Sequence, residues 1–357
     1  MNRKERRRQE KLAAHGGTGR APVSRPPAGP MALSAMLLRH AGQAPVAPID
    51  PAALEIVAPH AATGSVDAAF AKLRREDVLR QQLVTIQRAL EANPRSVDLL
   101  LTLAKLFRHM DRPDDALRAY RRVLEVDPAR QDVQHMIAAL SGVAPGDAPA
   151  RAADAYVAEE FDGFAARYDE VLVGWLEYRG PEILHRAVSE VLGAHPSPQE
   201  IIDLGCGTGL AARLFRPLAR RLDGVDLSAK MVEKARGRGL YDRLEVDEIG
   251  RYLAHTPQSY TLAIAADVLI YFGDLASVFS AVAGALKPHG LFVFTVEATS
   301  GAAYRLTASG RYAHDETYVR ETAAAAGFEV VRATDETVRK EKLQPVHSRC
   351  YVLRLRY

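Results

Sequence analysis

Three glycines at alternate positions follow a short run of β-branched residues. Residues 201–210 read Ile-Ile-Asp-Leu-Gly-Cys-Gly-Thr-Gly-Leu, and an apolar helical pattern starts at Leu210. Glycines allow the backbone N–H groups of a turn to approach a ligand closely. A strand, a tight turn and a helix start in this order therefore predict a site for a nucleotide-like ligand.

Two common phosphate-binding patterns do not describe this loop. The dinucleotide fingerprint G-x-G-x-x-G, started at Gly205, would need a third glycine where the sequence has Leu210. Its alanine-ending variant fits from Gly207 to Ala212, but its glycines then begin late after the strand. No Gly-Lys-Ser/Thr closes the loop, so the Walker pattern also fails. Of these patterns, only the alanine-ending variant that starts at Gly207 is still compatible with the loop.

A carboxylate at the end of the next predicted strand is the second part of this pattern. Asp226 lies about 20 residues after Gly205, where a carboxylate can accept hydrogen bonds from both ribose hydroxyls. Met231, one turn into the following helix, can contact an adenine ring through its polarisable sulfur. Asp226 could instead serve only as a helix start signal. Its coincidence with the glycine loop favours the ribose interpretation.

The loop after Asp203 and the run Asp-Leu-Ser-x-x-Met-x-x-x-Ala-Arg over 226–236 resemble class I S-adenosylmethionine-dependent methyltransferases. The resemblance extends from about Val157 to Tyr357. It implies S-adenosylmethionine as cofactor and a Rossmann-like α/β fold with seven strands, the last of them antiparallel. Matching segments are 161–169, 244–249, 265–269 and 286–291.

The resemblance also implies roles for single residues. Asp203 would shape the loop and contact the methionine ammonium group, and Asp247 or, preferably, Glu248 would meet the adenine amino group. Tyr168 would belong to a helix that covers the cofactor, although such a tyrosine is about as often a core residue. Cys206 is expected to be a loop residue, not a nucleophile. The cofactor contacts expected in this way are Tyr168, Asp203, Gly205, Cys206, Gly207, Gly209, Asp226, Leu227, Met231, Asp247, Glu248, Asp267 and Val268.

The chemistry of methyl transfer from a sulfonium requires mainly alignment of the nucleophile, with removal of a proton where oxygen or nitrogen attacks. The sequence does not identify the catalytic residue. Tyr168 and three residues of a polar insertion (Arg311, Tyr312 and His314) are weak candidates, and each could equally be an ordinary structural or surface residue. No metal is expected, because the histidines are scattered and Cys-x-x-Cys is absent. The Asn/Asp-Pro-Pro-Tyr/Phe motif of amino-group methylation is also absent.

Strand and helix patterns alternate beyond Pro196. This alternation predicts a parallel sheet with helices on both faces, and the last two strands, with no helix between them, should pair antiparallel. We expect strands near 200–204, 221–226, 243–246, 262–265, 291–296, 329–333 and 350–355. Helices are expected near 152–171, 181–192, 210–219, 229–236, 275–286 and 315–326.

An internal repeat precedes these elements. The segments 87–94 and 121–128 match each other at an interval of 34 residues, which resembles the tetratricopeptide repeat. The whole chain thus resembles bacterial predicted methyltransferases with N-terminal tetratricopeptide repeats. We expect a disordered basic and then Ala/Pro-rich leader, helical repeats, a linker and a methyltransferase domain, at 1–62, 63–141, 142–151 and 152–357.

Composition limits the remaining possibilities. Residues 1–25 hold eight Lys/Arg against two Glu, so the overall charge of +3 comes from this tail, and we expect no nucleic-acid-binding face on the body. The chain has 2 cysteines and no long apolar run, which favours the cytoplasm without a membrane segment. A small-molecule acceptor is favoured. The alternatives are a protein methyltransferase whose repeats recruit a protein partner, and a non-enzymatic binding module.

Overall fold

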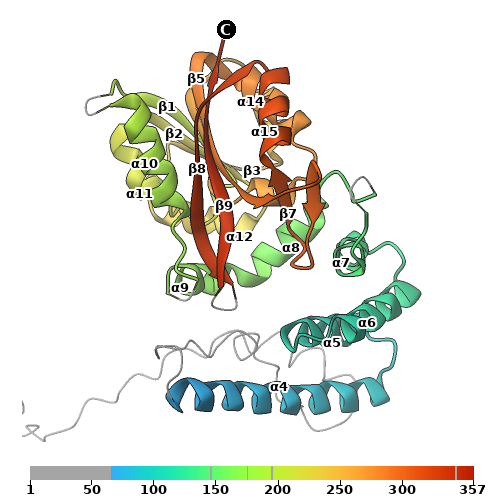
Figure 1. Cartoon of the computed structure of the whole chain (residues 1–357). Coiled ribbons are helices and arrows are strands. Elements are labelled where there is room, and N and C mark those ends of the chain that lie inside the picture. The colour runs from blue at the N-terminus through green and yellow to red at the C-terminus, as the bar shows by residue number, and fades with distance from the viewer. Residues whose placement is uncertain (1–65, 145–146, 175, 194–195, 342–343) are drawn as a thin grey trace, which may run out of the picture. The chain divides into compact units, whose positions relative to one another are not determined.

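The structure, a computed structural model, describes residues 66–357 apart from 145–146, 175, 194–195 and 342–343 (Figure 1). The described residues all belong to one compact unit. The predicted leader at 1–62 lies outside the described residues, and the bounds of the four predicted segments stay predictions.

Within the described residues, the chain begins with four helices that pack in chain order, each against the next. Local signals set their ends: Ser96 Oγ accepts the Leu99 N–H at 3.4 Å, Pro113 begins the third helix, and Gly142 ends the fourth with φ of 65°. These helices bury large and small apolar side chains against one another, among them Leu100, Leu103, Ala104, Phe107, Ala116 and Tyr120. The helices are α4 (Val66–Ala92), α5 (Val97–His109), α6 (Pro113–Val126) and α7 (Gln131–Ser141).

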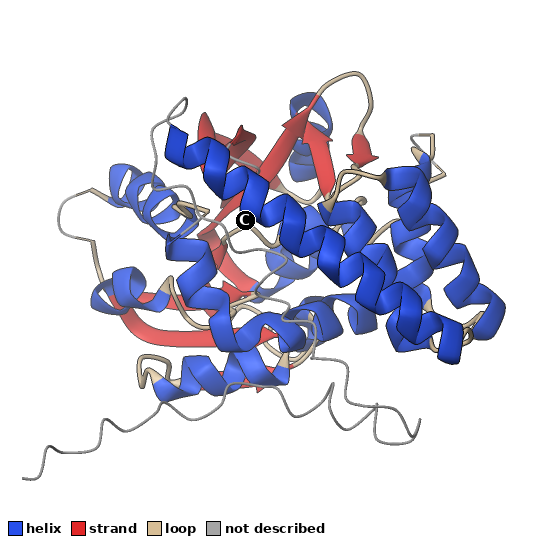
Figure 2. Ribbon diagram, turned by 90° about the horizontal axis from the view of Figure 1, so that it is seen from below, coloured by secondary structure: helices blue, strands red, loops and turns tan. Residues whose placement is uncertain are grey.

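The second part of the chain is a mostly parallel sheet with helices on both faces (Figure 2). Its helices are α8 (Asp154–Phe164), α9 (Tyr168–Gly174), α10 (Gly180–Leu192), α11 (Ala212–Phe215), α12 (Ala229–Gly237), α13 (Ile249–Ala254), α14 (Ala276–Ala285) and α15 (Glu316–Ala325). Its strands are β1 (Gln199–Leu204), β2 (Ala219–Asp226), β3 (Arg243–Val246), β4 (Tyr260–Ala265), β5 (Leu286–Thr299), β6 (Tyr304–Leu306), β7 (Tyr312–Asp315), β8 (Phe328–Glu341) and β9 (Gln344–Leu355).

The strand order confirms the predicted architecture and adds two strands to it. The order is β3-β2-β1-β4-β5, with β9 antiparallel to β5 and β8 antiparallel to β9. The seven expected strands are all present, and the predicted pairing of the last two is correct. The described residues contain nine strands, because the insertion at 304–314 forms the hairpin β6–β7, whose second strand runs parallel to the end of β5.

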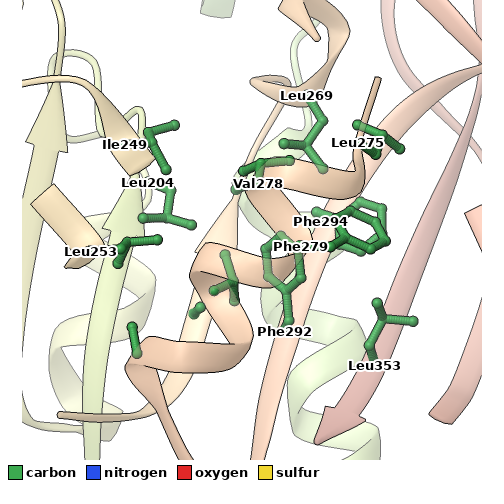
Figure 3. Close-up of a cluster of buried hydrophobic side chains, with 14 of the residues drawn as sticks. Leu204, Ile249, Leu253, Leu269, Leu275, Val278, Phe279, Phe292, Phe294 and Leu353 are labelled. Atoms are coloured by element: carbon green, nitrogen blue, oxygen red, sulfur yellow. The ribbon is translucent and has the colours of Figure 1, made fainter. Parts of the chain in front are cut away.

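Alternate residues of the central strands pack into two separate apolar layers. On one face, Phe292 and Phe294 of β5 pack with Phe279 of α14, as Figure 3 shows. On the other face, Leu291 and Val293 pack with α10 and α11. A period of two with both faces buried is what a parallel sheet between helices requires.

No helix among residues 66–357, as far as these are described, has the length and apolar character needed to cross a bilayer. Cys206 and Cys350 are both buried and unpaired.

Replacing Phe279 by alanine tests the first of these layers. Its ring is fully buried and lies 5.2 Å from that of Phe294 and 5.6 Å from that of Phe292. We expect Phe279→Ala to lower the free energy of unfolding by about 3–5 kcal/mol in urea denaturation followed by circular dichroism. Val246→Ala, at a half-exposed side chain, is the control and should change it by less than about 0.5 kcal/mol. Equal effects of the two changes would contradict this packing.

Candidate functional site

The glycine loop joins β1 to α11 where the strand order reverses. β1 lies between β2 and β4, and both run parallel to it. In such sheets ligands bind outside the carboxyl ends of the strands at this point. The predicted helix at 210–219 is shorter than expected: α11 ends at Phe215 and a 3-10 turn at 216–218 follows, because Pro217 lacks the N–H that would continue the helix.

The loop glycines have different surroundings: there is room for a ligand at Gly207, whereas Gly205 is closely packed. All three have positive φ, with 65° at Gly205, 54° at Gly207 and 82° at Gly209. A Cβ on Gly205 would lie 2.6 Å from Val268 Cγ2, whereas a Cβ on Gly207 would meet the ring of Tyr168 only at 3.9 Å. Gly207 therefore faces an open cradle that a side chain would enter, as the expected cofactor requires.

Asp226 ends β2 beside this cradle. Its Oδ2 accepts the Gly207 N–H and its Oδ1 accepts the Ser228 N–H, each at 2.8 Å. Burial raises the pKa of this carboxyl, while the two N–H groups oppose the rise. Among the residues that the structure describes, no lysine or arginine pairs with it. A carboxylate has about four acceptor positions, so two remain for a diol such as that of a ribose.

Asp203, near the end of β1, is almost completely buried. It accepts a hydrogen bond from Tyr241 Oη at 2.6 Å. Burial raises the pKa of Asp203 to about 7, and the Tyr241 hydroxyl opposes this rise. Tyr241 was not expected from the sequence, because it lies in the loop before β3 and no motif includes it.

The remaining residues expected on the nucleoside side have partners within the protein. Met231 is fully buried on α12, and Leu227 is half-buried. Asp247 forms an ion pair with Arg251. Glu248 caps α13 by accepting the Arg251 N–H at 2.9 Å and pairs with Arg151 at 3.0 Å. Both carboxylates are therefore already engaged, and the structure does not choose between them as the group that meets the adenine.

Tyr168, at the start of α9, covers the loop from the other side. The rings of Phe161 and Phe164 pack edge-on against its ring at 6.0 and 5.6 Å. Burial raises the pKa of its hydroxyl, and the charge of Asp267 raises it further. The helix before it is also tied to the site, because Asp162 of α8 accepts the Ser228 hydroxyl. Tyr168 thus packs among aromatic side chains and faces Gly207 at the same time.

A buried network of ion pairs lies at the end of β4. Asp267 has a positive φ of 61°, its N–H donates to Thr295 Oγ1 at 3.0 Å, and its carboxylate pairs with Arg339 of β8. Arg339 also pairs with Glu297 and Glu341. Burial opposes the charge of Arg339, but Asp267 and Glu297 raise its pKa above the ordinary value. Arg339 was not expected either, because no motif marks this part of β8.

Three of the weak catalytic candidates lie near β7. Arg311 joins the network by pairing with Glu297 at 3.0 Å and with Glu341. The Tyr312 hydroxyl donates to the Pro149 carbonyl at 2.7 Å. His314 is buried with Nε2 2.8 Å from the Phe272 carbonyl, and burial lowers its pKa to about 4. Tyr312 and His314 thus have structural partners in the backbone, and only Arg311 of the three belongs to the network around Asp267.

Cys206 and metal chemistry offer no alternative centre here. Burial raises the pKa of the Cys206 thiol well above its ordinary value, which disfavours the nucleophilic thiolate. Within the described residues, no three His, Cys, Asp or Glu side chains are grouped so that they could hold a metal ion. The arrangement combines the glycine loop and Asp226, at the ends of β1 and β2, with a charged, tyrosine-rich region at the end of β4.

Comparison with known proteins finds two family models that match separate parts of the chain. Residues 175–333 match a family model described as a methyltransferase domain, and residues 83–140 match a tetratricopeptide repeat model. The chain is similar to human methyltransferase-like protein 27, with 37% identity over 28% of this chain and 40% of that protein. It is 29% identical to a ubiquinone biosynthesis O-methyltransferase of Xylella fastidiosa, over 41% of this chain and 63% of the relative.

Two further matches complete the comparison. Trans-aconitate 2-methyltransferase of Pseudomonas paraeruginosa is 39% identical over 26% of this chain and 34% of that protein. The solved 1,6-didemethyltoxoflavin-N1-methyltransferase of Burkholderia thailandensis superposes with a TM-score of 0.47 and 20% identity, over 60% of this chain and 95% of the other. The chain thus spans less than two thirds of the length of each of the three relatives matched by sequence.

Filling the cradle at Gly207 tests its role as a ligand site. Gly207→Ala places a methyl group in the space in front of Tyr168, so we expect the affinity for S-adenosylmethionine to fall at least about tenfold in calorimetry. Gly142→Ala imposes the same left-handed strain at φ of 65°, in open space at the end of α7, and should leave the affinity unchanged. Equal affinities of the two variants would remove the cradle from the binding site.

The buried Asp203 predicts a pH dependence of stability. Its pKa is about 7 in the folded protein and about 4 in an unfolded chain, so the folded state binds the proton more tightly. The free energy of unfolding contributed by this group is therefore largest below about pH 4 and falls as pH rises towards about 7. Urea denaturation between about pH 5 and pH 8 should show a smaller fall for Asp203→Asn than for the wild type. Parallel profiles would contradict the raised pKa.

Proposed function

We propose, from the class I methyltransferase domain and the N-terminal tetratricopeptide repeats that this chain carries, that it transfers the methyl group of S-adenosylmethionine to an oxygen or nitrogen of a small molecule. The observation that supports this most is the meeting of Asp203, the glycine loop and Asp226 at the carboxyl ends of β1 and β2. The two carboxylates and the open face of Gly207 suit a nucleoside with a charged amino-acid chain.

The residues of this chain would bind and orient the reactants. S-adenosylmethionine, when bound, supplies a methyl group on a sulfonium that is already a good leaving group. Asp226 would accept the two ribose hydroxyls, and Gly207 would leave its open face to the ligand. Tyr168 and the aromatic side chains behind it would exclude water, which favours attack by the acceptor over attack by solvent. No metal is needed for these steps.

A small-molecule acceptor is supported by the relatives and by the region around Asp267. Two relatives are named for ubiquinone biosynthesis and for trans-aconitate. Tyr168 and Tyr271 lie on this side of the site, because the ring of Phe161 packs edge-on against both, at 6.0 and 5.7 Å. Two tyrosine hydroxyls and a buried ion-pair network would give a compact acceptor polar groups to bind.

A protein acceptor is the second candidate, and the tetratricopeptide repeat match is the observation that favours it. Repeats of this kind present surfaces on which another protein could be recruited. The intact glycine loop and the engaged Asp226 support an enzyme over a non-enzymatic binding module.

Replacing Asp226 tests the cofactor assignment. Asp226→Ala should weaken S-adenosylmethionine binding by roughly 1–3 kcal/mol in calorimetry, because ribose hydroxyls in the cradle would lose their acceptor. Asp223→Asn is the matched control, since Asp223 is a buried carboxylate of the same strand that accepts the Tyr260 hydroxyl at 2.9 Å. An unchanged affinity of Asp226→Ala would defeat the assignment.

The wild type and Asp226→Ala also serve to identify the class of the acceptor. Cell extract is separated into metabolite and protein fractions, and each is incubated with the wild type and methyl-labelled S-adenosylmethionine. We expect mass spectrometry to find the label in the metabolite fraction, and Asp226→Ala to lower it when S-adenosylmethionine is kept below saturation. Label in the protein fraction alone would overturn the small-molecule proposal in favour of the second candidate.

A further inference from the structure

The turn between β6 and β7 is held by the repeats. Arg108 of α5 donates to the Ser309 carbonyl at 3.2 Å, and His135 of α7 lies with Nε2 2.8 Å from the Gly310 carbonyl. A carbonyl can only accept, so Nε2 of His135 carries the proton and donates it. Two side chains of the repeats therefore fix two successive carbonyls of this turn.

His135 is enclosed at this contact. It is almost completely buried, its ring lies 5.0 Å from that of Tyr156 and 5.9 Å from that of Tyr312, and burial lowers its pKa. The opposing Gly310 has φ of 87°, and a Cβ there would lie 2.9 Å from Met136 Sδ. The positive φ favours glycine at this position, and a Cβ there would require the Met136 side chain to move.

The repeats hold α8 as well. The Tyr156 hydroxyl contacts Met136 Sδ at 3.5 Å, and Glu160 and Glu159 pair with Lys105 and Arg130, each at 3.3 Å. Ion pairs at partly exposed sites such as these contribute little to stability. The packing of Tyr156 against His135 and Met136 is therefore the stronger part of the contact.

The β6–β7 turn and α8, which the repeats contact, both lead to residues around Asp267. Arg311 follows Gly310 in the chain and pairs with Glu297, which Arg339 joins to Asp267. Phe161 of α8 packs edge-on against Tyr271 at 5.7 Å as well as against Tyr168. By contrast, the contacts of Asp226 with Gly207 and Ser228 involve no residue of α5 or α7.

We propose that the repeats are a positioning element of the transferase site, in which His135 fixes the β6–β7 turn and, through Arg311, the acceptor side around Asp267. This inference rests on the proposed function, because it assumes that the acceptor enters at the end of β4. The repeats then act within their own chain: loss of the turn contact loosens the acceptor side. The hydrogen bonds of Asp226 to Gly207 and Ser228 involve no residue of the repeats, which reach the cofactor side only through Asp162 and Phe161 of α8.

Variants on both sides of the contact test this inference in the full chain. His135→Ala removes the donor, His135→Gln restores an N–H that can reach Gly310, and Gln134→Ala is an exposed control on the same helix. Gly310→Ala pushes the turn away from Met136 without changing the repeats. Gly301→Ala is its matched control, with φ of 84° and open space around it.

The readouts separate positioning from folding and from cofactor binding. For His135→Ala and Gly310→Ala we expect hydrogen exchange over residues 304–315 to rise about fivefold to tenfold, as the loss of one buried hydrogen bond implies. Methyl labelling of the extract should fall by at least a similar factor. S-adenosylmethionine affinity should stay within about twofold of the wild type, and His135→Gln and both controls should behave as the wild type.

Different results overturn different statements. A wild type that does not bind S-adenosylmethionine would refute the proposed function itself. A wild type that binds and labels, with exchange over 304–315 and labelling unchanged in both His135→Ala and Gly310→Ala, would refute the positioning role alone. Increased exchange throughout α5–α7 in Gly310→Ala, without a rise at 304–315, would also refute it.

Discussion

The parallel pairing of β1 with both β2 and β4 is the constraint on which the site depends. Asp203 lies level with Gly224 of β2 and Ile264 of β4, so the segments that follow these strands leave the sheet at one edge. The glycine loop, Asp226 and Asp267 meet there although long stretches of chain separate them. Because both faces of the sheet are covered by apolar layers, this edge is where polar groups of the three strands can face a ligand.

The two halves of that edge stabilise buried carboxylates in different ways. Asp226 is held by backbone N–H groups, which leaves acceptor positions free for neutral hydroxyls. Asp267 and Glu297 are held by Arg339, which is itself almost completely buried. Removing one partner of a buried ion pair leaves an uncompensated charge, so the network is rigid only while it is complete. This rigidity suits a surface that must hold an acceptor in line with a methyl group.

The repeats contact the second half directly through the β6–β7 turn and reach the first half only through α8, whose Asp162 accepts the Ser228 hydroxyl. Arg108 and His135 reach the β6–β7 turn, and Tyr156 brings α8 against α7. Because the repeats pack against the methyltransferase domain of the same chain, part of their surface is covered by it. Less of that surface is then available to bind another protein. The repeats and the methyltransferase domain are thus better described as one unit than as a binding module attached to an enzyme.

The sequence by itself determined the order of elements and the repeats, and it predicted a ligand site at the glycine loop. Local rules account for this. Alternate glycines after a strand, a carboxylate after the next strand, alternating apolar residues and a repeat of 34 residues can all be recognised along the chain. The three loop glycines have the positive φ that their residue type permits. It also correctly predicted the antiparallel pairing of β8 with β9. What only the tertiary structure decided are contacts between distant segments. Arg339, Tyr241 and His135 belong to no motif, and they matter because the fold places them beside Asp267, Asp203 and Gly310. Likewise the polar insertion at 304–314 forms a hairpin, because β7 pairs with the end of β5 and His135 of α7 binds the carbonyl of Gly310 in the turn. Local periodicity shows neither contact.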